Sequence, residues 1–412
     1  MKDNTLQVQI FGINYFPEVT GIGPYTTGLA EFLADEGHCV SVVTGFPSYP
    51  QWRIRPPYRR LLWRNETRNG VNLRRRWNYV PTSQTAVRRA LYELTFLLSG
   101  LTGLKGGRPD LIIGVIPSMS GGVLARLGSH WFKVPYCLVF QDLMGLAALQ
   151  SGMEGGVAVS RWVARIEQWV IRRASSAGVI AEGFKPYVAA SGMAETKIYR
   201  LRNWTVTKEP TEERLVTRKW LGIDPQDFVC VHAGNMGLKQ ELNNVIECAR
   251  LAEAAAPGLR FLMVGDGSQR ALLEDLTESY GLKNLTFVPV LPDDDFPNVL
   301  AAADVLLLNQ SAAIADMALP SKLTAYLASG RAVVAAVAPD SETAREILAS
   351  GGGELVPPAS PEALLAKITE LASDPDRLAD LGRRGKDYAQ TRLSVAEARR
   401  LFFLFLEDLL KA

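Results

Sequence analysis

The stretch LQVQIFGINYFPEVTGIGPYTTG, residues 6–28, places a strand, a glycine turn and a helix start in direct succession. Apolar residues dominate 6–13, as in a buried parallel strand, and Gly21, Gly23 and Pro24 follow before a predicted helix. Pro24 suits the first turn of a helix, because the N–H that proline lacks would have no partner there. Strand, turn and helix in this order predict the first unit of a doubly wound parallel sheet.

Strand-like runs alternate with helical segments along the rest of the chain, in two series. A polar, proline-containing linker over 205–214 separates the series. The further strands are predicted at 40–44, 110–115, 136–140, 178–181 and 197–204, and then at 228–234, 260–265, 285–289, 303–308 and 332–337. Two such series predict an α/β protein with two Rossmann-like, doubly wound parallel-sheet domains that face a cleft, with ligands at the carboxyl ends of the strands.

The composition excludes several classes of protein. With 47% hydrophobic residues among 412, the chain is too apolar to be disordered. It contains no apolar run of about 18 residues, so no membrane-spanning helix is predicted. The four cysteines lack C-x-x-C spacing, which argues against a disulfide framework and fits a reducing cytosol. The N-terminus has no signal-peptide pattern, and we therefore expect a cytoplasmic protein.

Positive charge is concentrated between Gln51 and Asp110. This stretch has 13 Lys and Arg against 3 acidic residues, although the whole chain has a net charge of only +2. Aromatic residues are interleaved with the arginines, and Leu91, Leu94 and Leu98 follow at helical spacing. The segment therefore combines a basic surface with an apolar helix face.

Three interpretations of this segment remain open: a solvated basic face over an ordinary core helix, a peripheral membrane footprint, or a nucleic-acid surface. Basic side chains attract anionic headgroups, and Trp and Tyr prefer the membrane interface. No recognition helix or RNA-binding sheet is predicted, so we expect no nucleic acid. We favour an anionic membrane surface, and the patch that would contact the membrane or the acceptor is Arg74, Arg75, Arg76, Arg88 and Arg89.

Two glycine turns follow strands of the second series. In AGNMGLKQEL, residues 233–242, Gly234 ends a strand and Lys239 stands at the start of a predicted helix. An ammonium group beside free helix N–H groups makes a diphosphate site, the alternative being a surface lysine after a turn. Gly265 and Gly267 mark a similar turn after the next strand.

The segment ALPSKLTAYLASG, residues 318–330, is the densest motif in the chain. Pro320 and Ser321 are predicted to start a helix, with Ser321 as its N-cap. Lys322 and the N–H groups of the first turn are placed to hold a phosphate, while Leu323 packs inward. No Walker A motif occurs, and the glycine spacing near the N-terminus departs from the dinucleotide-binding pattern.

Several motifs occur in a fixed order that resembles one family. They are FPEVTGIGPYT (16–26), GNMG with Lys239 (234–239), VGDG (264–267), PSKL followed by YLASGR (320–331) and GGGELVPP (351–358). Together they resemble the family-4 retaining GT-B glycosyltransferases, in the branch of colanic-acid and O-antigen (WcaI/WbuB-like) sugar transferases. The resemblance spans nearly the whole chain, and the order and spacing of the motifs make it specific.

The resemblance implies a domain organisation and a reaction. It implies an acceptor-binding domain over 1–205, a nucleotide-sugar-binding domain over 206–390 and a last helix over 391–412 that packs back on the first domain. A UDP- or GDP-sugar would be the co-substrate, with no cofactor and no metal, and a polyprenyl-linked saccharide the acceptor at the inner face of the plasma membrane. A nucleotide-sugar epimerase and a non-catalytic nucleotide-sugar-binding protein remain alternatives.

The resemblance also implies roles for residues. Gly23, with Gly21 beside it, would lie near the transferred sugar, and Lys239 would bind the diphosphate. Asn235 stands where many members carry Arg. Lys239 and the backbone N–H groups near Gly23 and Gly234 would stabilise charge in a front-face mechanism. The segment that would contact the base of the donor is Pro289, Val290 and Leu291.

The chain departs from the family pattern at one pair of positions. The family's Glu-x7-Glu pair overlays Met317 and Ala325, neither of which is acidic. Asp316 neighbours the first position and is the candidate to contact the sugar. Asp142 is the candidate to position the acceptor hydroxyl, with helix capping as the alternative. No catalytic histidine is evident, and His38, His130 and His232 are interpreted as structural.

Overall fold

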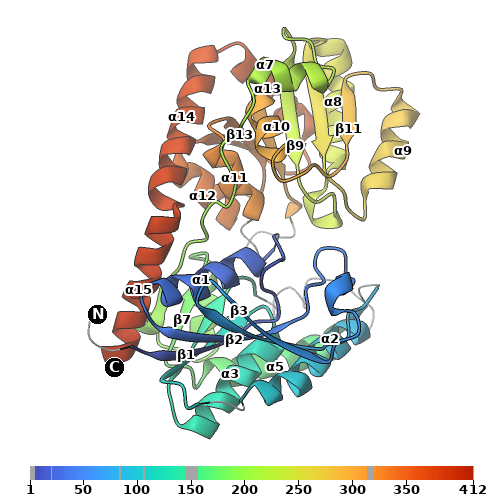
Figure 1. Ribbon diagram of the computed structural model, residues 1–412. Helices are drawn as coiled ribbons and strands as arrows, with labels where there is room; N and C mark the ends of the chain where they lie inside the picture. The colour runs from blue at the N-terminus through green and yellow to red at the C-terminus, as the bar shows by residue number, and fades with distance from the viewer. Residues whose placement is uncertain are drawn as a thin grey trace. The chain divides into compact units, whose positions relative to one another are not determined.

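The computed structural model describes residues 5–19, 21–82, 85–104, 107–143, 156–312 and 320–411. The chain forms two compact units (Figure 1). The first unit consists of Met1–Arg202 with Ala398–Ala412, and the second of Asn203–Glu397. These bounds lie a few residues from the limits expected at 205 and 390.

The first unit contains a sheet in the order β3-β4-β2-β1-β5-β6-β7-β8. Only β3 runs antiparallel to its neighbour, and the other paired strands are parallel. The strands are β1 (Gln7–Phe11), β2 (Cys39–Gly45), β3 (Trp63–Arg68), β4 (Val71–Arg76), β5 (Leu111–Ile116), β6 (Tyr136–Phe140), β7 (Ser176–Val179) and β8 (Ile198–Arg200). The chain order reverses between β1 and β5, which is where ligands bind in doubly wound sheets.

The hairpin formed by β3 and β4 lies inside the basic segment, where no strand is predicted above. Its turn is Asn69-Gly70, with φ of 44° and 76°, the backbone conformation of a tight two-residue hairpin. Asn-Gly between two strand-forming runs is a strong hairpin signal. Part of the basic segment is therefore sheet rather than open surface.

Helices cover both faces of this sheet (Figure 1). They are α1 (Gly23–Asp35), α2 (Ala86–Gly100), α3 (Met119–Phe132), α5 (Gly156–Ile171), α6 (Phe184–Ala190) and α15 (Val395–Lys411), with short 3-10 turns η1 (Pro56–Tyr58), η2 (Leu101–Leu104) and η3 (Glu195–Lys197). α2, α3 and α5 lie on one face, and α3 packs against the other two.

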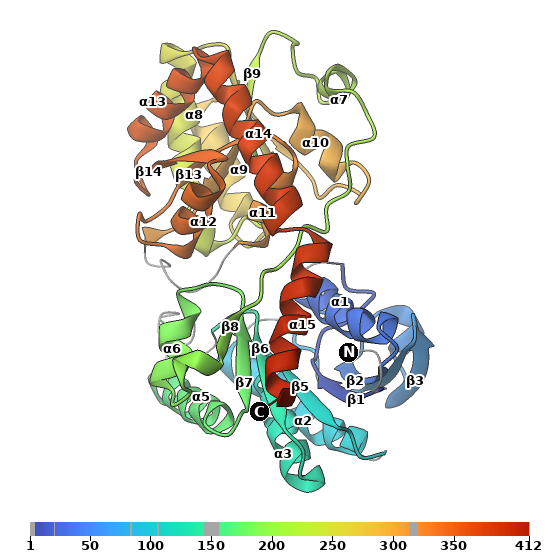
Figure 2. The ribbon, with the colours of Figure 1, turned by 90° about the vertical axis from the view of Figure 1, so that its left-hand side faces the viewer.

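The C-terminal helix α15 packs on the first unit (Figure 2). Phe405 contacts Tyr199 of β8 with ring centroids 5.3 Å apart. Arg399 forms ion pairs with Asp35 and Glu36 at the end of α1, at 3.3 and 2.8 Å. The last helix thus belongs to the N-terminal unit.

The second unit contains a fully parallel sheet in the order β11-β10-β9-β12-β13-β14. Its strands are β9 (Phe228–Ala233), β10 (Leu259–Val264), β11 (Leu285–Val288), β12 (Val305–Asn309), β13 (Ala332–Ala336) and β14 (Gly353–Val356). Its helices are α7 (Arg214–Trp220), η4 (Leu238–Gln240), α8 (Asn243–Ala255), α9 (Arg270–Tyr280), α10 (Phe296–Ala302), α11 (Ser321–Ala328), α12 (Glu342–Ser350), α13 (Pro361–Ala372) and α14 (Pro375–Arg392). This strand order is that of the classic dinucleotide-binding fold, and it reverses between β9 and β12.

Both faces of this sheet are buried, which explains the continuous apolar runs of its strands. Val229 and Val231 of β9 belong to one core cluster, whereas Cys230 between them belongs to a second. Leu306 and Leu307 of β12 divide in the same way. Alternate residues therefore fill opposite layers, and the prediction of doubly wound parallel sheets is confirmed.

Candidate functional site

Two glycine turns lie at the carboxyl edge of the second sheet, where β9 and β10 end. Gly234 and Gly265 have φ of 135° and 129°, a region that favours glycine. A Cβ on Gly265 would lie 2.1 Å from the carbonyl oxygen of Gly234, and one on Gly267 would lie 2.4 Å from that of Met236. The structure therefore brings the three predicted donor-binding glycines together and requires glycine at each position.

The amides of these turns mostly serve the turns themselves. The N–H of Gly234 donates to the carbonyl of Val264 at 2.8 Å, and that of Gly265 donates to Val288 at 3.0 Å. The N–H of Gly234 itself is therefore engaged within the sheet edge, and the prediction that N–H groups near Gly234 stabilise charge on a ligand stays a prediction for its neighbours. The glycines instead give neighbouring side chains room to approach.

Lys322 approaches the first of these turns from the first turn of α11. Its Nζ lies 3.5 Å from Nε2 of His232, and its Cε lies 3.3 Å from the point that a Cβ of Gly234 would occupy. The side chain is partly exposed as a whole, but protein atoms enclose the amine. This burial lowers the pKa of Lys322 to about 7. Glycine at position 234 thus makes space for a buried amine.

The described surroundings of this amine contain no compensating acid. Among the described residues, no carboxylate forms a hydrogen bond or an ion pair with Lys322. His232 is fully buried, and burial together with the neighbouring amine lowers the pKa of His232 well below its ordinary value. The amine lies beside a neutral imidazole, at the point where the strand order reverses. Because no described carboxylate balances its charge, this arrangement is suited to binding an anionic ligand.

The hydroxyl of Tyr326 holds α11 against the two strands at this point. It accepts a hydrogen bond from the N–H of Ala233 at 2.7 Å and donates to the carbonyl of Ala233 at 3.1 Å. The carbonyl of Leu307 in β12 lies 3.4 Å away. Since Tyr326 is one turn after Lys322, these bonds fix the position of the amine.

A second lysine, Lys239, lies on an ordered turn five residues after Gly234 in the sequence. Lys239 is exposed and belongs to the 3-10 turn η4, not to the start of a helix as predicted, because α8 begins only at Asn243. Asn309 at the end of β12 donates to the carbonyls of Gln240 and Glu241 at 2.7 and 2.9 Å, which fastens this turn to the sheet edge. The turn is fixed, while the amine of Lys239 is accessible to a ligand.

The first unit also has a glycine turn, between β1 and α1. Gly21 has a φ of 67°, and a Cβ on Gly23 would lie 2.7 Å from the carbonyl oxygen of Glu18. Glu18 is 3% exposed, and burial raises the pKa of its carboxyl group. Oε1 accepts from the N–H groups of Ser48 and Tyr49, each at 2.8 Å. The carboxylate therefore organises the loop.

Comparisons with known proteins agree with this arrangement. A model of the group 1 glycosyl transferases matches residues 214–388, and a model of the glycosyl transferase 4-like domain matches 20–204. The Escherichia coli protein named as the colanic acid biosynthesis glycosyl transferase WcaI is 31% identical over 96% of this chain and 98% of its own length. The chain belongs to this glycosyltransferase family.

Solved structures agree on the fold. Sucrose-phosphate synthase from Thermosynechococcus elongatus is 17% identical, with a TM-score of 0.75 over 98% of this chain and 99% of that one. HepE of Anabaena, in complex with UDP-glucose, is 16% identical, with a TM-score of 0.69 over 98% of this chain and all of that one. The predictions of the family, of the GT-B fold and of a glycosyltransferase are confirmed.

The start of α11 in this glycosyltransferase differs from the prediction. Pro320 occupies the N-cap position, and Ser321 is the first helical residue and makes no capping hydrogen bond. Leu323 is buried as expected. Ala325, at the position of the family's second glutamate, is 6% exposed and lies in the core. Met317 and Asp316 lie outside the described residues.

The segment after β11 lies at the same sheet edge as the glycine turns, since β11 pairs in parallel with β10. Pro289 and Val290 are exposed and Leu291 is partly buried. Arg270, which the sequence reading did not single out, donates to the carbonyls of Gly265 and Val288 at 2.5 and 3.4 Å. It ties the second glycine turn to the predicted base-binding segment of the transferase.

The predicted basic patch is partly wrong. Arg75 is 1% exposed, and it donates to Glu66 at 2.5 Å and to the carbonyl of Phe16 at 2.6 Å. Arg76 is 9% exposed and bonds to Thr102 at 2.7 Å. Both side chains serve the interior of the transferase's first unit, so neither can contact a membrane.

The other predicted residues of the first unit keep more local roles. Arg74 donates to the carbonyl of Gly103 at 2.8 Å. The guanidinium of Arg89 lies 4.9 Å from the ring of Trp52, and Arg88 is partly buried on the same helix. Asp142 accepts from the N–H of Leu143 at 2.8 Å.

Proposed function

We propose that this transferase moves a sugar from a UDP- or GDP-sugar, with retention of configuration, to a polyprenyl-linked glycan at the cytoplasmic membrane face. The observation that carries the donor part is the buried amine of Lys322 at the strand reversal of the second unit, without a carboxylate partner among the described residues. The similarity to the Escherichia coli relative named for colanic acid biosynthesis supports a role in glycan synthesis, and the UDP-glucose complex of HepE supports a nucleotide-sugar donor.

The chemistry requires positive charge where the diphosphate leaves. The bond between the anomeric carbon and the phosphate oxygen breaks, and the bond to the acceptor oxygen forms on the same face of the sugar. The acceptor proton passes to the departing phosphate oxygen. Lys322, with Lys239 as a second cation, offsets the charge that develops on the diphosphate, so this scheme needs no metal. Asn235 cannot supply that charge, and its amide donates to Gln240 at 3.3 Å.

The membrane part of the proposal is supported by α2. Leu91, Leu94 and Leu98 are 42%, 49% and 59% exposed, whereas Tyr92 and Phe96 on the opposite side are buried. The leucine stripe predicted from the sequence thus faces solvent. In the part of the chain that the structure describes, no helix is long and apolar enough to cross a membrane. These facts support attachment at the surface of the bilayer.

Two measurements test the transferase activity. Thermal unfolding with a panel of nucleotide sugars should show one donor class that stabilises the protein by about 2.7 kcal/mol at 100 times its dissociation constant. Incubation of that donor with polyprenyl-linked saccharides should then give a glycosylated lipid whose new linkage keeps the donor's anomeric configuration. An isomerised free donor would instead indicate an epimerase, and binding without any product would indicate a non-catalytic protein.

Lys239→Ala tests the second cation. We expect turnover to fall about 10²-fold if its charge acts in the transition state. Lys283→Ala, which removes another exposed lysine of the same unit, is the matched control and should leave turnover unchanged. A near wild-type rate for Lys239→Ala would remove this residue from the mechanism.

A further inference from the structure

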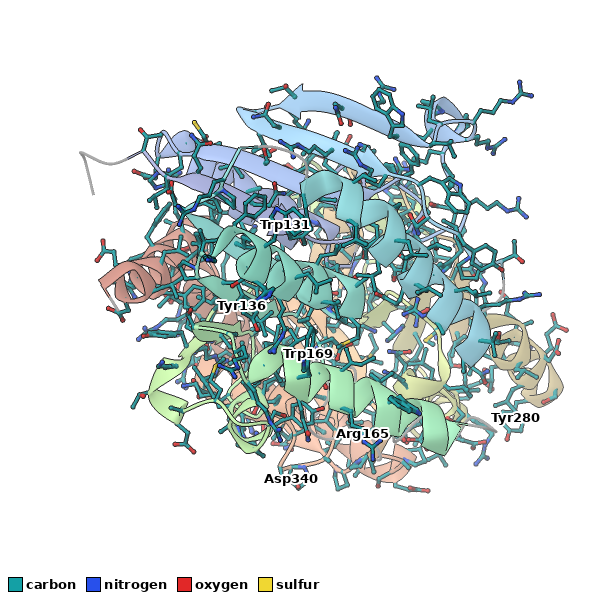
Figure 3. All side chains as sticks on the ribbon, turned by 90° about the horizontal axis from the view of Figure 1, so that it is seen from below. Trp131, Tyr136, Arg165, Trp169, Tyr280 and Asp340 are labelled. Atoms are coloured by element: carbon teal, nitrogen blue, oxygen red, sulfur yellow. The ribbon has the colours of Figure 1, made fainter. Side chains whose placement is uncertain are left out.

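Three neighbouring helices, α2, α3 and α5, form one face of the first unit (Figure 3). Large apolar side chains stand exposed on each of them. Trp131 at the end of α3 is 76% exposed and Trp162 of α5 is 64% exposed. The other exposed apolar residues of this face are Val87, Leu91, Leu94, Leu98, Ile166 and Trp169. A monomeric water-soluble protein rarely exposes this many large apolar side chains on one face without a partner for them.

The charge of this face has one sign among the side chains that the structure describes. α3 contains no acidic residue, and α2 and α5 contain only Glu93 and Glu167. Glu93 accepts hydrogen bonds from Ser118 and Ser120, and Glu167 is 1% exposed and bonds to Tyr187. Both carboxylates point inward, so the exposed charges of the three helices are cationic.

A hollow of about 360 Å³ opens in this face between α3 and α5, and we call it the arginine pocket. It is lined by Arg126, Arg165, Gln168, Trp169, Arg172 and Arg173. The guanidinium of Arg126 stacks on the ring of Trp169 at 3.8 Å and donates to the carbonyl of the same residue. Figure 3 shows Arg165 and Trp169 along α5, with Trp131 on the neighbouring helix.

The lining has the chemistry of a phosphate site. Four of its six residues are arginines, and none of the described lining residues is acidic. Four guanidinium groups around one hollow repel one another unless an anion lies between them. Arginine presents planar pairs of donors that match phosphate oxygens. Trp169 in the lining, and Trp162 with its ring 5.6 Å from the guanidinium of Arg165, are of a residue type that prefers the boundary between headgroups and acyl chains.

We propose that this face docks on an anionic lipid bilayer, with the phosphate of a lipid headgroup held in the arginine pocket and the tryptophans and the α2 leucines at the headgroup boundary. The inference rests on the proposed membrane location and names the surface and the lipid group responsible. It moves the membrane contact away from Arg75 and Arg76, which are internal. Apolar residues on three adjacent helices favour a bilayer over a nucleic acid, which offers no acyl boundary to exposed leucines.

Vesicle flotation tests this proposal with a matched pair of variants. The vesicles contain phosphatidylcholine alone, or with phosphatidylglycerol as about one third of the lipid. The pocket variant is Arg165→Gln/Arg173→Gln, and the control variant is Arg53→Gln/Arg60→Gln, which removes the same charge from exposed positions of the same unit outside the pocket. Wild type should float only with anionic vesicles. The pocket variant should bind at least about tenfold more weakly, and the control should bind like wild type.

Each outcome bears on the proposal. Equal losses in both variants would mean unspecific attraction and would overturn the pocket. Wild-type flotation of the pocket variant would also overturn it, as would tight binding of a duplex RNA without binding of vesicles. Soluble inorganic phosphate that occupies the pocket should compete with the lipid headgroup, so vesicles that stay bound at saturating phosphate would show that the headgroup is not held there.

A second measurement checks the tryptophans and the fold. Brominated lipids should quench wild-type tryptophan fluorescence, and Trp162→Phe should lose part of the quenching while still floating. The thermal unfolding of the pocket variant without donor should match wild type, which shows that its first unit is folded, and nucleotide-sugar stabilisation of the second unit should be unchanged. Loss of vesicle binding with intact donor stabilisation separates this proposal from the proposed transferase, whose own failure would appear as absent donor stabilisation in wild type.

Discussion

The two units both place a glycine turn after their first strand, but they treat the charged groups beside it differently. In the first unit, Glu18 accepts three hydrogen bonds, from Ser48, Tyr49 and Asn14, and Arg75 is bonded to Glu66 and to the carbonyl of Phe16. These charged groups have partners of opposite charge or backbone partners in the protein, although Nη1 of Arg75 itself forms no hydrogen bond, and their role is to shape the loop.

In the described part of the second unit the corresponding charge has no such partners. The amine of Lys322 touches only the buried imidazole of His232 at 3.5 Å, among the contacts of the described residues. Burying an unpaired amine costs free energy, which a protein tolerates where a ligand later supplies the opposite charge. The comparison indicates that Glu18 and Arg75, which have partners in the protein, have a structural role. The amine of Lys322, which has no carboxylate partner among the described residues, indicates the ligand site.

Lys322→Met has the largest expected effect and tests directly whether the amine of Lys322 binds the ligand or has a structural role. Removal of the amine should lower kcat/KM about 10³-fold, because the charge that offsets the leaving diphosphate is gone. The donor-free variant should unfold at the same temperature as wild type or higher, since a buried amine has been replaced by an apolar side chain of similar length. A variant that loses stability and keeps its activity would assign Lys322 to the architecture.

Arg75→Met should show the opposite pattern in the first unit. Loss of the charged hydrogen bonds to Glu66 and Phe16 should lower the free energy of unfolding by about 2 kcal/mol. Donor binding by the folded protein should stay at the wild-type level, because this side chain serves the first unit only. Denaturant unfolding and donor titration measure the two quantities. Unchanged stability with weakened donor binding would reverse the assignment.

The parts of this picture that the sequence predicts are those carried by local patterns. Strands buried on both faces are continuous apolar runs, so the sequence locates the parallel strands. Positions with φ above zero favour glycine, so Gly234 and Gly265 locate the carboxyl ends of two strands. The Asn69-Gly70 pair is a local pattern of the same kind, and it marks the hairpin within the arginine-rich segment. Ser321 shows that a residue type suited to capping does not fix the register of a helix start.

The pairing of Lys322 with His232 leaves no local trace. The two residues are far apart in the sequence and meet only because β9 and β12 are neighbours and α11 follows β12. The burial of Arg75 cannot be recognised in the sequence either, because the sequence shows only a run of three arginines. Its position on β4 turns the side chain inward toward Glu66. Side-chain direction and long-range contact therefore decide the site, and both required the structure.

The smallest expected effect is a pH dependence of donor binding that arises from the titration of the Lys322 amine. In the donor-free protein its pKa is about 7, so the amine loses its proton as the pH rises above 7. A diphosphate attracts the charged form and raises the pKa, so donor binding above pH 7 takes up a proton. Affinity should then fall by at most about tenfold per pH unit. Calorimetry in buffers of different ionisation enthalpy measures the proton uptake directly.

The same pKa fixes the sign of an effect on stability. The pKa in the donor-free folded protein lies below the ordinary value of 10.5, so the unfolded chain binds more protons between pH 7 and 10.5. The stability of wild type relative to Lys322→Met should therefore rise with pH across that window. Lys322→Arg, which stays charged, should bind donor without the proton uptake. If Lys322→Met keeps the wild-type pH profile of donor binding, another group titrates, and the contrast between the two units loses its chemical basis.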